Sequence, residues 1–234
     1  MSRDQQSSRR GPRSAIPFVL LVVLMLGSGA TAWLSSRSSS SQVGPEGVVV
    51  FDVPDLAPAT TTLTGQSVDG ITCQTEAKEV VKYHIHVHIT VYVNGKMTRL
   101  PAGIGITQPP LVEESSAGPF YDVGLYDCLY WLHTHVADGI VHVEAPVKQV
   151  FTLGQFFDIW NQPLAASRVG PASGKVVVFE NGKQLTGDPR STPMLAHGDI
   201  QIDVGSPLVA FHPFPFKVAG ACGQGTSSCS TPKS

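Results

Sequence analysis

Apolar and polar residues alternate strictly from His84 to Val93, with an apolar side chain at every second position. This pattern is typical of a β-strand with one apolar face and one polar face. The Asn94-Gly95 pair that follows favours a tight hairpin turn. Residues 96–106 are therefore predicted to return beside the first strand.

Two further hairpins and a last strand are expected downstream. Residues 129–135 and 140–146 flank a turn at Asp138-Gly139, and a third hairpin at 175–187 turns at Asn181-Gly182. Residues 197–205 supply the last strand, whereas residues 107–127 are interpreted as a long loop.

One helix is predicted within residues 151–164. Leu153, Phe156, Phe157 and Trp160 form a one-sided apolar stripe at helical spacing, and Thr152 is placed to cap the first turn. The order hairpin, helix, hairpin, strand predicts an α+β fold, mainly an antiparallel sheet of hairpins with one covering helix. The closing segment 196–205, in which Gly-Asp precedes an apolar strand, resembles the last strand of the β-grasp superfold.

The N-terminal residues have the pattern of a targeting segment. Residues 16–33 form an uncharged run of eighteen residues, long enough for a single transmembrane helix, and four arginines precede it. By the positive-inside rule, residues 1–15 are cytoplasmic and the rest of the chain lies outside the cell membrane. Alternatively, a signal peptide is cleaved after Ala32 and the protein is secreted.

The expected domain organisation follows from these features and from composition. After the signal anchor at 16–33 come a Ser/Thr-rich linker with a possible first strand at 34–64, an extracytoplasmic globular domain at 65–217 and a flexible tail at 218–234. The net charge is −2 for the chain and −5 from Leu34 onward, with no basic stripe, which excludes a typical nucleic-acid binder.

The four cysteines would meet an oxidising compartment if the domain is exported. We expect the disulfides Cys73–Cys128 and Cys222–Cys229. The first closes a long loop, which in the chain-entropy model stabilises the fold by about 4 kcal/mol. The alternative is that Cys222 and Cys229 stay free and bind a metal or a partner thiol.

Six of the eight histidines lie in the first two hairpins. Because side chains alternate across a strand, His84, His86 and His88 share one face, as do His133 and His135 on one strand and His142 and Glu144 on the next. A two-residue turn would pair His135 with His142, whereas a four-residue loop at 136–139 would pair His133 with His142; both registers leave these groups on one face.

Such a cluster suits a transition metal, with Zn or Cu favoured and Fe or Mn as alternatives. The candidate ligands are His133, His135, His142 and Glu144, joined by His84, His86 and His88 if the hairpins pair. For the first strand, solvated histidines with no metal are an equal alternative. Asp127 and Asp138 are interpreted as ligand-orienting groups or as turn residues, and His197 and His212 as structural.

The segments 84–95, 129–144 and 151–160 together resemble uncharacterised exported histidine-rich proteins of bacteria and archaea, over about residues 70–205. The resemblance implies one structural unit and no particular activity.

Three functions remain open from the sequence. The first is a membrane-anchored extracytoplasmic protein that binds a transition metal on a histidine-rich sheet face. The second is a metalloenzyme that uses the same cluster, with an open coordination position. The third is a non-metal module that binds an envelope protein. No G-x-S-x-G, Walker, C-x-x-C or H-E-x-x-H motif is present in the sequence.

Overall fold

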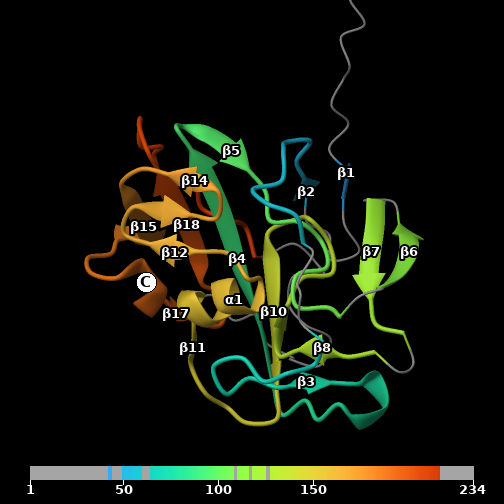
Figure 1. The fold of residues 1–234 in the computed structure, drawn as a ribbon. Coiled ribbons are helices and arrows are strands. Elements are labelled where there is room, and N and C mark those ends of the chain that lie inside the picture. Colours follow the sequence, from blue (N-terminus) through green and yellow to red (C-terminus); the bar gives the residue numbers. More distant parts are fainter. Residues whose placement is uncertain are drawn as a thin grey trace, which may run out of the picture. The chain divides into compact units, whose positions relative to one another are not determined.

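A seven-stranded sheet built around the long strand β4 (Tyr83–Val93) organises the protein (Figure 1). The computed structural model describes residues 42–43, 49–59, 64–107, 110–115, 118–124 and 127–216, all within the unit Ser39–Ser234. The expected anchor at 16–33, the tail at 218–234 and the pair Cys222–Cys229 lie outside these ranges. Among the described residues, no helix is both long and apolar enough to cross a membrane.

The other elements are, in chain order, β1 (Gln42–Val43), β2 (Val49–Val50), β3 (Cys73–Gln74), the 3-10 helix η1 (Glu76–Lys78), β5 (Lys96–Thr98), β6 (Leu111–Ser115), β7 (Gly118–Asp122), β8 (Leu129–Tyr130), β9 (Leu132–His133), β10 (Ile140–Ala145), β11 (Phe151–Thr152), α1 (Leu153–Ile159), β12 (Leu164–Ala165), β13 (Arg168–Val169), β14 (Ala172–Ser173), β15 (Val176–Glu180), β16 (Lys183–Gln184), the 3-10 helix η2 (Pro189–Ser191), β17 (Pro193–Met194) and β18 (Asp199–Val204).

The large sheet has the strand order β16-β15-β18-β4-β10-β9, and β5 pairs with β4. Neighbours are antiparallel except β18 and β4, which are parallel. The prediction of a mainly antiparallel α+β fold with one helix is thus confirmed for the described part of the chain. Both predicted Asn-Gly turns are present, and Asn94 and Gly95 have positive φ angles of 51° and 75°, as a type I′ turn requires.

Two local predictions were wrong. The strand after Gly95 was expected to cover 96–106, but β5 ends at Thr98. Beyond it the chain turns into the interior, where Leu100 and Ile104 are fully buried, and Pro101 has no N–H to donate to a ladder. The expected loop at 107–127 contains the antiparallel hairpin β6–β7, which lies beside the large sheet in Figure 1.

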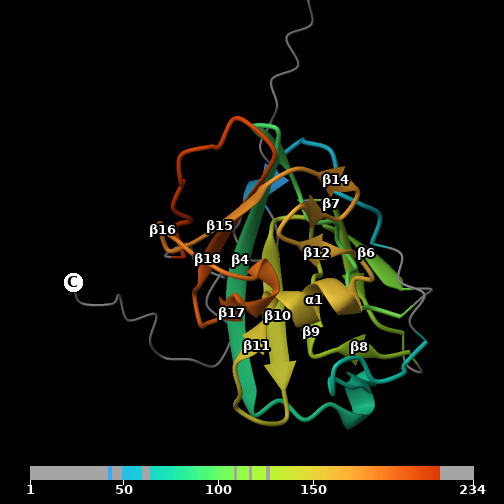
Figure 2. The same ribbon diagram turned by 60° about the vertical axis from the view of Figure 1, so that its left-hand side comes forward.

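The apolar face of the sheet packs against α1 (Figures 1 and 2). Val87, Ile89 and Val91 of β4 belong to the same buried cluster as Phe157 and Trp160 of the helix segment. Thr152 caps α1 as predicted, and Gln155 completes a capping box by accepting a hydrogen bond from the Thr152 N–H. Because α1 covers the apolar face of the sheet, the polar side chains of its strands lie on the opposite face.

Residues 51–59, which sequence analysis places in the linker, contact this core. Leu56 and Ala57 are buried, and the indole N–H of Trp160 donates to the carbonyl of Pro58 at 2.9 Å. The chain that precedes the first long strand is therefore part of the packed structure.

The opposite face of β18 holds the segment 209–214 by hydrogen bonds to its backbone. Asp203 accepts from the Val209 N–H, and Asp199 accepts from the Phe214 N–H. Between them, the Gln201 amide donates to the Val209 carbonyl at 3.0 Å and accepts from the His212 N–H at 3.2 Å. The alternation of residues 199–204 thus supplies apolar side chains to the core and polar ones to this C-terminal strap (residues 209–214).

We expect the substitution Gln201→Ala to loosen the C-terminal strap. It removes both amide contacts with the strap, and each lost hydrogen bond costs about 0.5–1.5 kcal/mol. Hydrogen exchange should show lower protection at His212, and urea unfolding a lower free energy of unfolding. Gln184→Ala, at an exposed position of β16, is the matched control and should change neither measurement. Unaltered exchange in Gln201→Ala would contradict this role.

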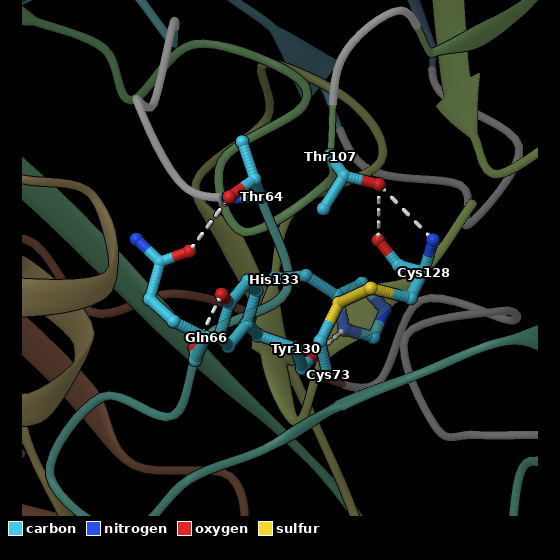
Figure 3. The surroundings of a disulfide bond; sticks show 7 residues. All are labelled: Thr64, Gln66, Cys73, Thr107, Cys128, Tyr130 and His133. Atoms are coloured by element: carbon cyan, nitrogen blue, oxygen red, sulfur yellow. Dashed lines mark hydrogen bonds between the residues drawn. A yellow bond between two sulfur atoms is a disulfide. The ribbon is translucent and has the colours of Figure 1, made fainter.

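The predicted disulfide Cys73–Cys128 is confirmed. It joins the regions of β3 and β8, which pair through Cys73 and Tyr130. Figure 3 shows Tyr130 and His133 beside this disulfide. The Thr107 hydroxyl donates a hydrogen bond to the Cys128 carbonyl and accepts one from the Cys128 N–H. The disulfide therefore fastens the chain that leads into the second group of histidines.

Candidate metal centre

Strand β10 lies between β4 and β9 and brings both groups of histidines together. His142 of β10 is directly opposite His86 of β4 on one side and His133 of β9 on the other. Of the two registers that the sequence allows, the structure has the one with the four-residue loop. Glu144 lies opposite His84 in the same sheet. A row of three imidazoles therefore crosses three neighbouring strands.

These side chains form two triads that share His142. The inner triad is His133, His135 and His142, and the outer triad is His84, His86 and His142; within each, one possible ligand atom per residue lies within 4.8 Å of the others. The Nε2 atoms of His133 and His135 are 3.1 Å apart, and those of His84 and His86 are 3.0 Å apart. Each H-x-H pair is thus arranged to chelate an ion.

The hydrogen bonds of His133 and His135 determine which ring nitrogen is available as a ligand. His133 Nδ1 lies 2.8 Å from the Tyr130 carbonyl, and His135 Nδ1 lies 2.6 Å from the Tyr121 carbonyl. A carbonyl can only accept, so both Nδ1 atoms carry the proton. In the neutral imidazoles, both Nε2 atoms then present lone pairs to each other.

Burial keeps the two rings of this pair neutral. Burial lowers the pKa of His133 to about 4, against the opposing negative charge of Glu144. Burial, followed by the positive charges of His133 and His142, lowers the pKa of His135 to about 3. At neutral pH no proton is therefore held between the Nε2 atoms. Their separation is close to the roughly 3.3 Å between two ligands of a tetrahedral zinc ion with bonds of about 2.0–2.1 Å.

Neighbouring side chains pack closely around the inner triad. His133 is fully buried, and the ring of Phe120 stacks on His135 with centroids 4.6 Å apart. The rings of His133 and His142 are also stacked, at 5.3 Å. The Nδ1 hydrogen bonds of His133 and His135 add to this packing, because a hydrogen bond to the second ring nitrogen orients a metal-binding histidine and fixes its tautomer.

Two carboxylates lie at the outer side of the row. Glu144 Oε1 is 3.0 Å from His84 Nε2 and 3.4 Å from His142 Nδ1. Burial opposes the ionisation of Glu144, but its hydrogen bonds from His142 and His84 hold its pKa well below the usual value. Burial, and then the negative charge of Glu144, raise the pKa of Glu79 to about 7.

The remaining predicted candidates lie elsewhere. His88 belongs to neither triad: its Nδ1 is 2.9 Å from Asp199 Oδ1, and its ring stacks on Phe214 at 3.8 Å. Asp138 accepts from the Ile140 N–H, as a turn residue does. The backbone N–H of Asp127 donates to the Gly124 carbonyl in a tight turn.

Both histidines interpreted as structural lie outside the triads. The ring of His197 contacts Phe216, and the backbone N–H of His212 donates to Gln201.

Some groups of the site were not found by sequence reasoning. The carbonyls of Tyr130 and Tyr121 have no sequence signature, because every residue has one. Glu79 precedes two valines in a segment without clear periodicity, so only the tertiary structure brings it beside Glu144.

The arrangement offers imidazole nitrogens and carboxylate oxygens to a cation in a largely buried setting, a donor set that suits Zn, Cu or Fe. Comparisons of this chain with protein-family models, curated proteins and solved structures found no match.

Proposed function

We propose that the protein binds a transition-metal ion through His133, His135 and His142. The observation that carries this proposal is the 3.1 Å separation of two Nε2 atoms whose Nδ1 partners are both committed to carbonyl oxygens. Two facing lone pairs repel each other, and burial disfavours a proton between them. A metal ion removes this repulsion and uses both nitrogens as ligands.

The residues around the inner triad give this function its physical basis. The carbonyls of Tyr130 and Tyr121 orient the two rings, Phe120 covers one of them, and Glu144 lies within reach of His142 Nδ1. Zn or Cu fits the neutral imidazole set best, with Fe or Mn as alternatives. A fixed set of ligands of this kind suits a protein that binds or carries metal.

Elemental analysis of the full chain, purified without a histidine tag, tests the proposal. We expect a stoichiometric amount of a transition metal that survives gel filtration. A protein that is folded, is offered Zn²⁺ or Cu²⁺ and retains neither would refute it, and would favour a module that binds an envelope protein.

A metalloenzyme is the second candidate. It is favoured by the partial exposure of His84, since a catalytic metal needs one position open to water or substrate.

For the fold, we propose a β-grasp-like arrangement. Support comes from the hairpin β4–β5, the helix α1, the hairpin β15–β16 and the last strand β18, which lies parallel to β4 at the centre of the sheet. Strands β10 and β9 then extend the sheet on the far side of β4 and carry His142 and His133.

We also propose that residues 16–33 anchor the protein in the cell membrane with the metal-binding domain outside. The four arginines that precede the uncharged run and the disulfide Cys73–Cys128 support this orientation.

In right-side-out vesicles, we expect external protease to digest the domain. In untreated membranes, we expect the intact chain to stay with the membrane after an alkaline wash. Replacing Arg3, Arg9, Arg10 and Arg13 by serine is the control that should weaken this orientation. Release of a domain that begins at Trp33 would show cleavage instead, and full protection from protease would contradict export.

A further inference from the structure

We propose that the cluster holds a second metal ion, bound by His84, His86 and Glu144 (the outer site), beside the ion of the inner triad. This inference deepens the proposed function and rests on it, because both ions would occupy one continuous row of ligands. It assigns different roles to the two positions: a more covered one in the inner triad and a more accessible one at the outer site.

The geometry of the outer site is that of a chelate. His84 Nε2 lies 3.0 Å from His86 Nε2 and 3.0 Å from Glu144 Oε1. His84 Nε2 is thus close enough to each of the other two atoms to share an ion with it at bonds of about 2.0–2.1 Å. Backbone pairing fixes their positions, since His84 and Glu144 are direct partners across β4 and β10.

One ion cannot use all five histidines. Ligands on opposite sides of an ion with bonds of about 2.0–2.1 Å lie at most about 4.2 Å apart. Among the described residues, no group of ligand atoms within 4.8 Å of one another contains both a histidine of β4 and His133 or His135. The ligand atoms accordingly fall into two groups that share only His142. With His142 assigned to the inner ion, His84 and His86 remain for a second one, and Glu144 Oε1 lies 3.0 Å from His84 Nε2.

The carboxylates give the outer site the charge that a cation needs. The side chain of Glu144 is 14% exposed and its Oε1 lies 3.0 Å from His84 Nε2. Glu79 Oε1 is buried and has no hydrogen-bond partner among the described residues. A buried negative charge needs a positive partner, which a cation bound at Glu144 supplies.

The two positions differ in access to solvent. The side chain of His84 is 30% exposed and that of Glu144 is 14% exposed, whereas His133 is 0% exposed. An ion at the outer site therefore has room for water or another ligand in a further coordination position, as catalytic and exchangeable sites do. The inner triad is more covered, because His133 is fully buried and the ring of Phe120 stacks on its half-buried member, His135.

The test is the number of zinc ions per chain. The full chain is saturated with Zn²⁺, freed of excess by gel filtration and analysed for metal, and the release of zinc to a chelator is then followed over time. We expect two ions per chain and two phases of release, the faster from the outer site. His84→Ala and Glu144→Gln should each remove one ion and the fast phase. His212→Ala, which removes an exposed histidine outside both triads, should change neither.

The outcomes separate this inference from the proposed function. One ion per chain at saturation, with unchanged stoichiometry in Glu144→Gln, would overturn the second site and leave the inner one standing. No bound zinc at all would overturn both. Circular dichroism of each variant shows whether it is folded, and Glu144→Gln, which nearly preserves the side-chain shape, keeps the test valid if His84→Ala does not fold.

Discussion

Replacing His133 and His135 together by alanine is expected to remove the ion of the inner triad completely. The two Nε2 atoms, 3.1 Å apart, form the chelate, and without them the inner triad keeps only His142 as a ligand. The metal content measured after gel filtration should therefore be lower by one ion per chain than that of the parent protein. Each single variant removes one of the two chelating rings together with its Nδ1 hydrogen bond to Tyr130 or Tyr121, so it should also bind the ion more weakly.

The matched control is the pair of substitutions His197→Ala and His212→Ala. It removes two histidines that lie outside both triads and should leave the metal content unchanged. An equal loss of metal in both double variants would indicate general unfolding or surface binding. Unchanged metal content in His133→Ala/His135→Ala, in a folded protein, would show that the inner triad is not the binding site.

The metal-free protein is expected to lose stability as the pH falls from about 6.5 to 5. The pKa values of His133 and His135 are lowered to about 4 and about 3 in the folded state. Over this interval the unfolded chain takes up protons at both residues and the folded chain does not, so protonation favours unfolding. The free energy of unfolding should drop by about 1.6 kcal/mol for each histidine, or about 3 kcal/mol for the pair, because the unfolded chain is already half protonated at pH 6.5.

Glu79 acts in the opposite direction. Because its pKa is raised to about 7 in the folded state, the folded chain binds its proton more readily, and this contribution to stability grows as the pH falls from 7 towards 4.5. The useful measurement is therefore a difference: urea unfolding of the parent and of His133→Gln/His135→Gln, both treated with chelator, at pH 6.5 and 5. The variant should lose about 3 kcal/mol less than the parent. His212→Gln should match the parent, and equal losses in all three proteins would contradict burial of neutral imidazoles.

Local sequence patterns predicted much of the fold because they express local physics. The alternation of His84 to Val93 requires two unlike faces on one strand, and Asn94-Gly95 satisfies the positive φ angles of a tight turn. Thr152 and the apolar stripe after it predicted α1 and its start. The failures at 96–106 and 107–127 concern segments in which Pro101 and several glycines interrupt the pattern, so distant contacts decide the course of the backbone.

For the candidate site, the sequence by itself determined that His84, His86, His133, His142 and Glu144 lie on polar strand faces, since side-chain direction alternates along any strand. It also restricted the pairing of the second hairpin to two registers. His135 was expected on the same strand as His133, but β9 ends at His133, and only the tertiary structure places the ring of His135 beside it.

Only the tertiary structure decided which strands lie side by side. By placing β10 between β4 and β9, it opposed His142 to both His86 and His133, and it separated His88 from the triads by pairing it with Asp199. The ionisation of the histidines was likewise beyond the sequence. The pKa of an imidazole depends on burial and on neighbouring charges, and here these come from residues far apart in the chain.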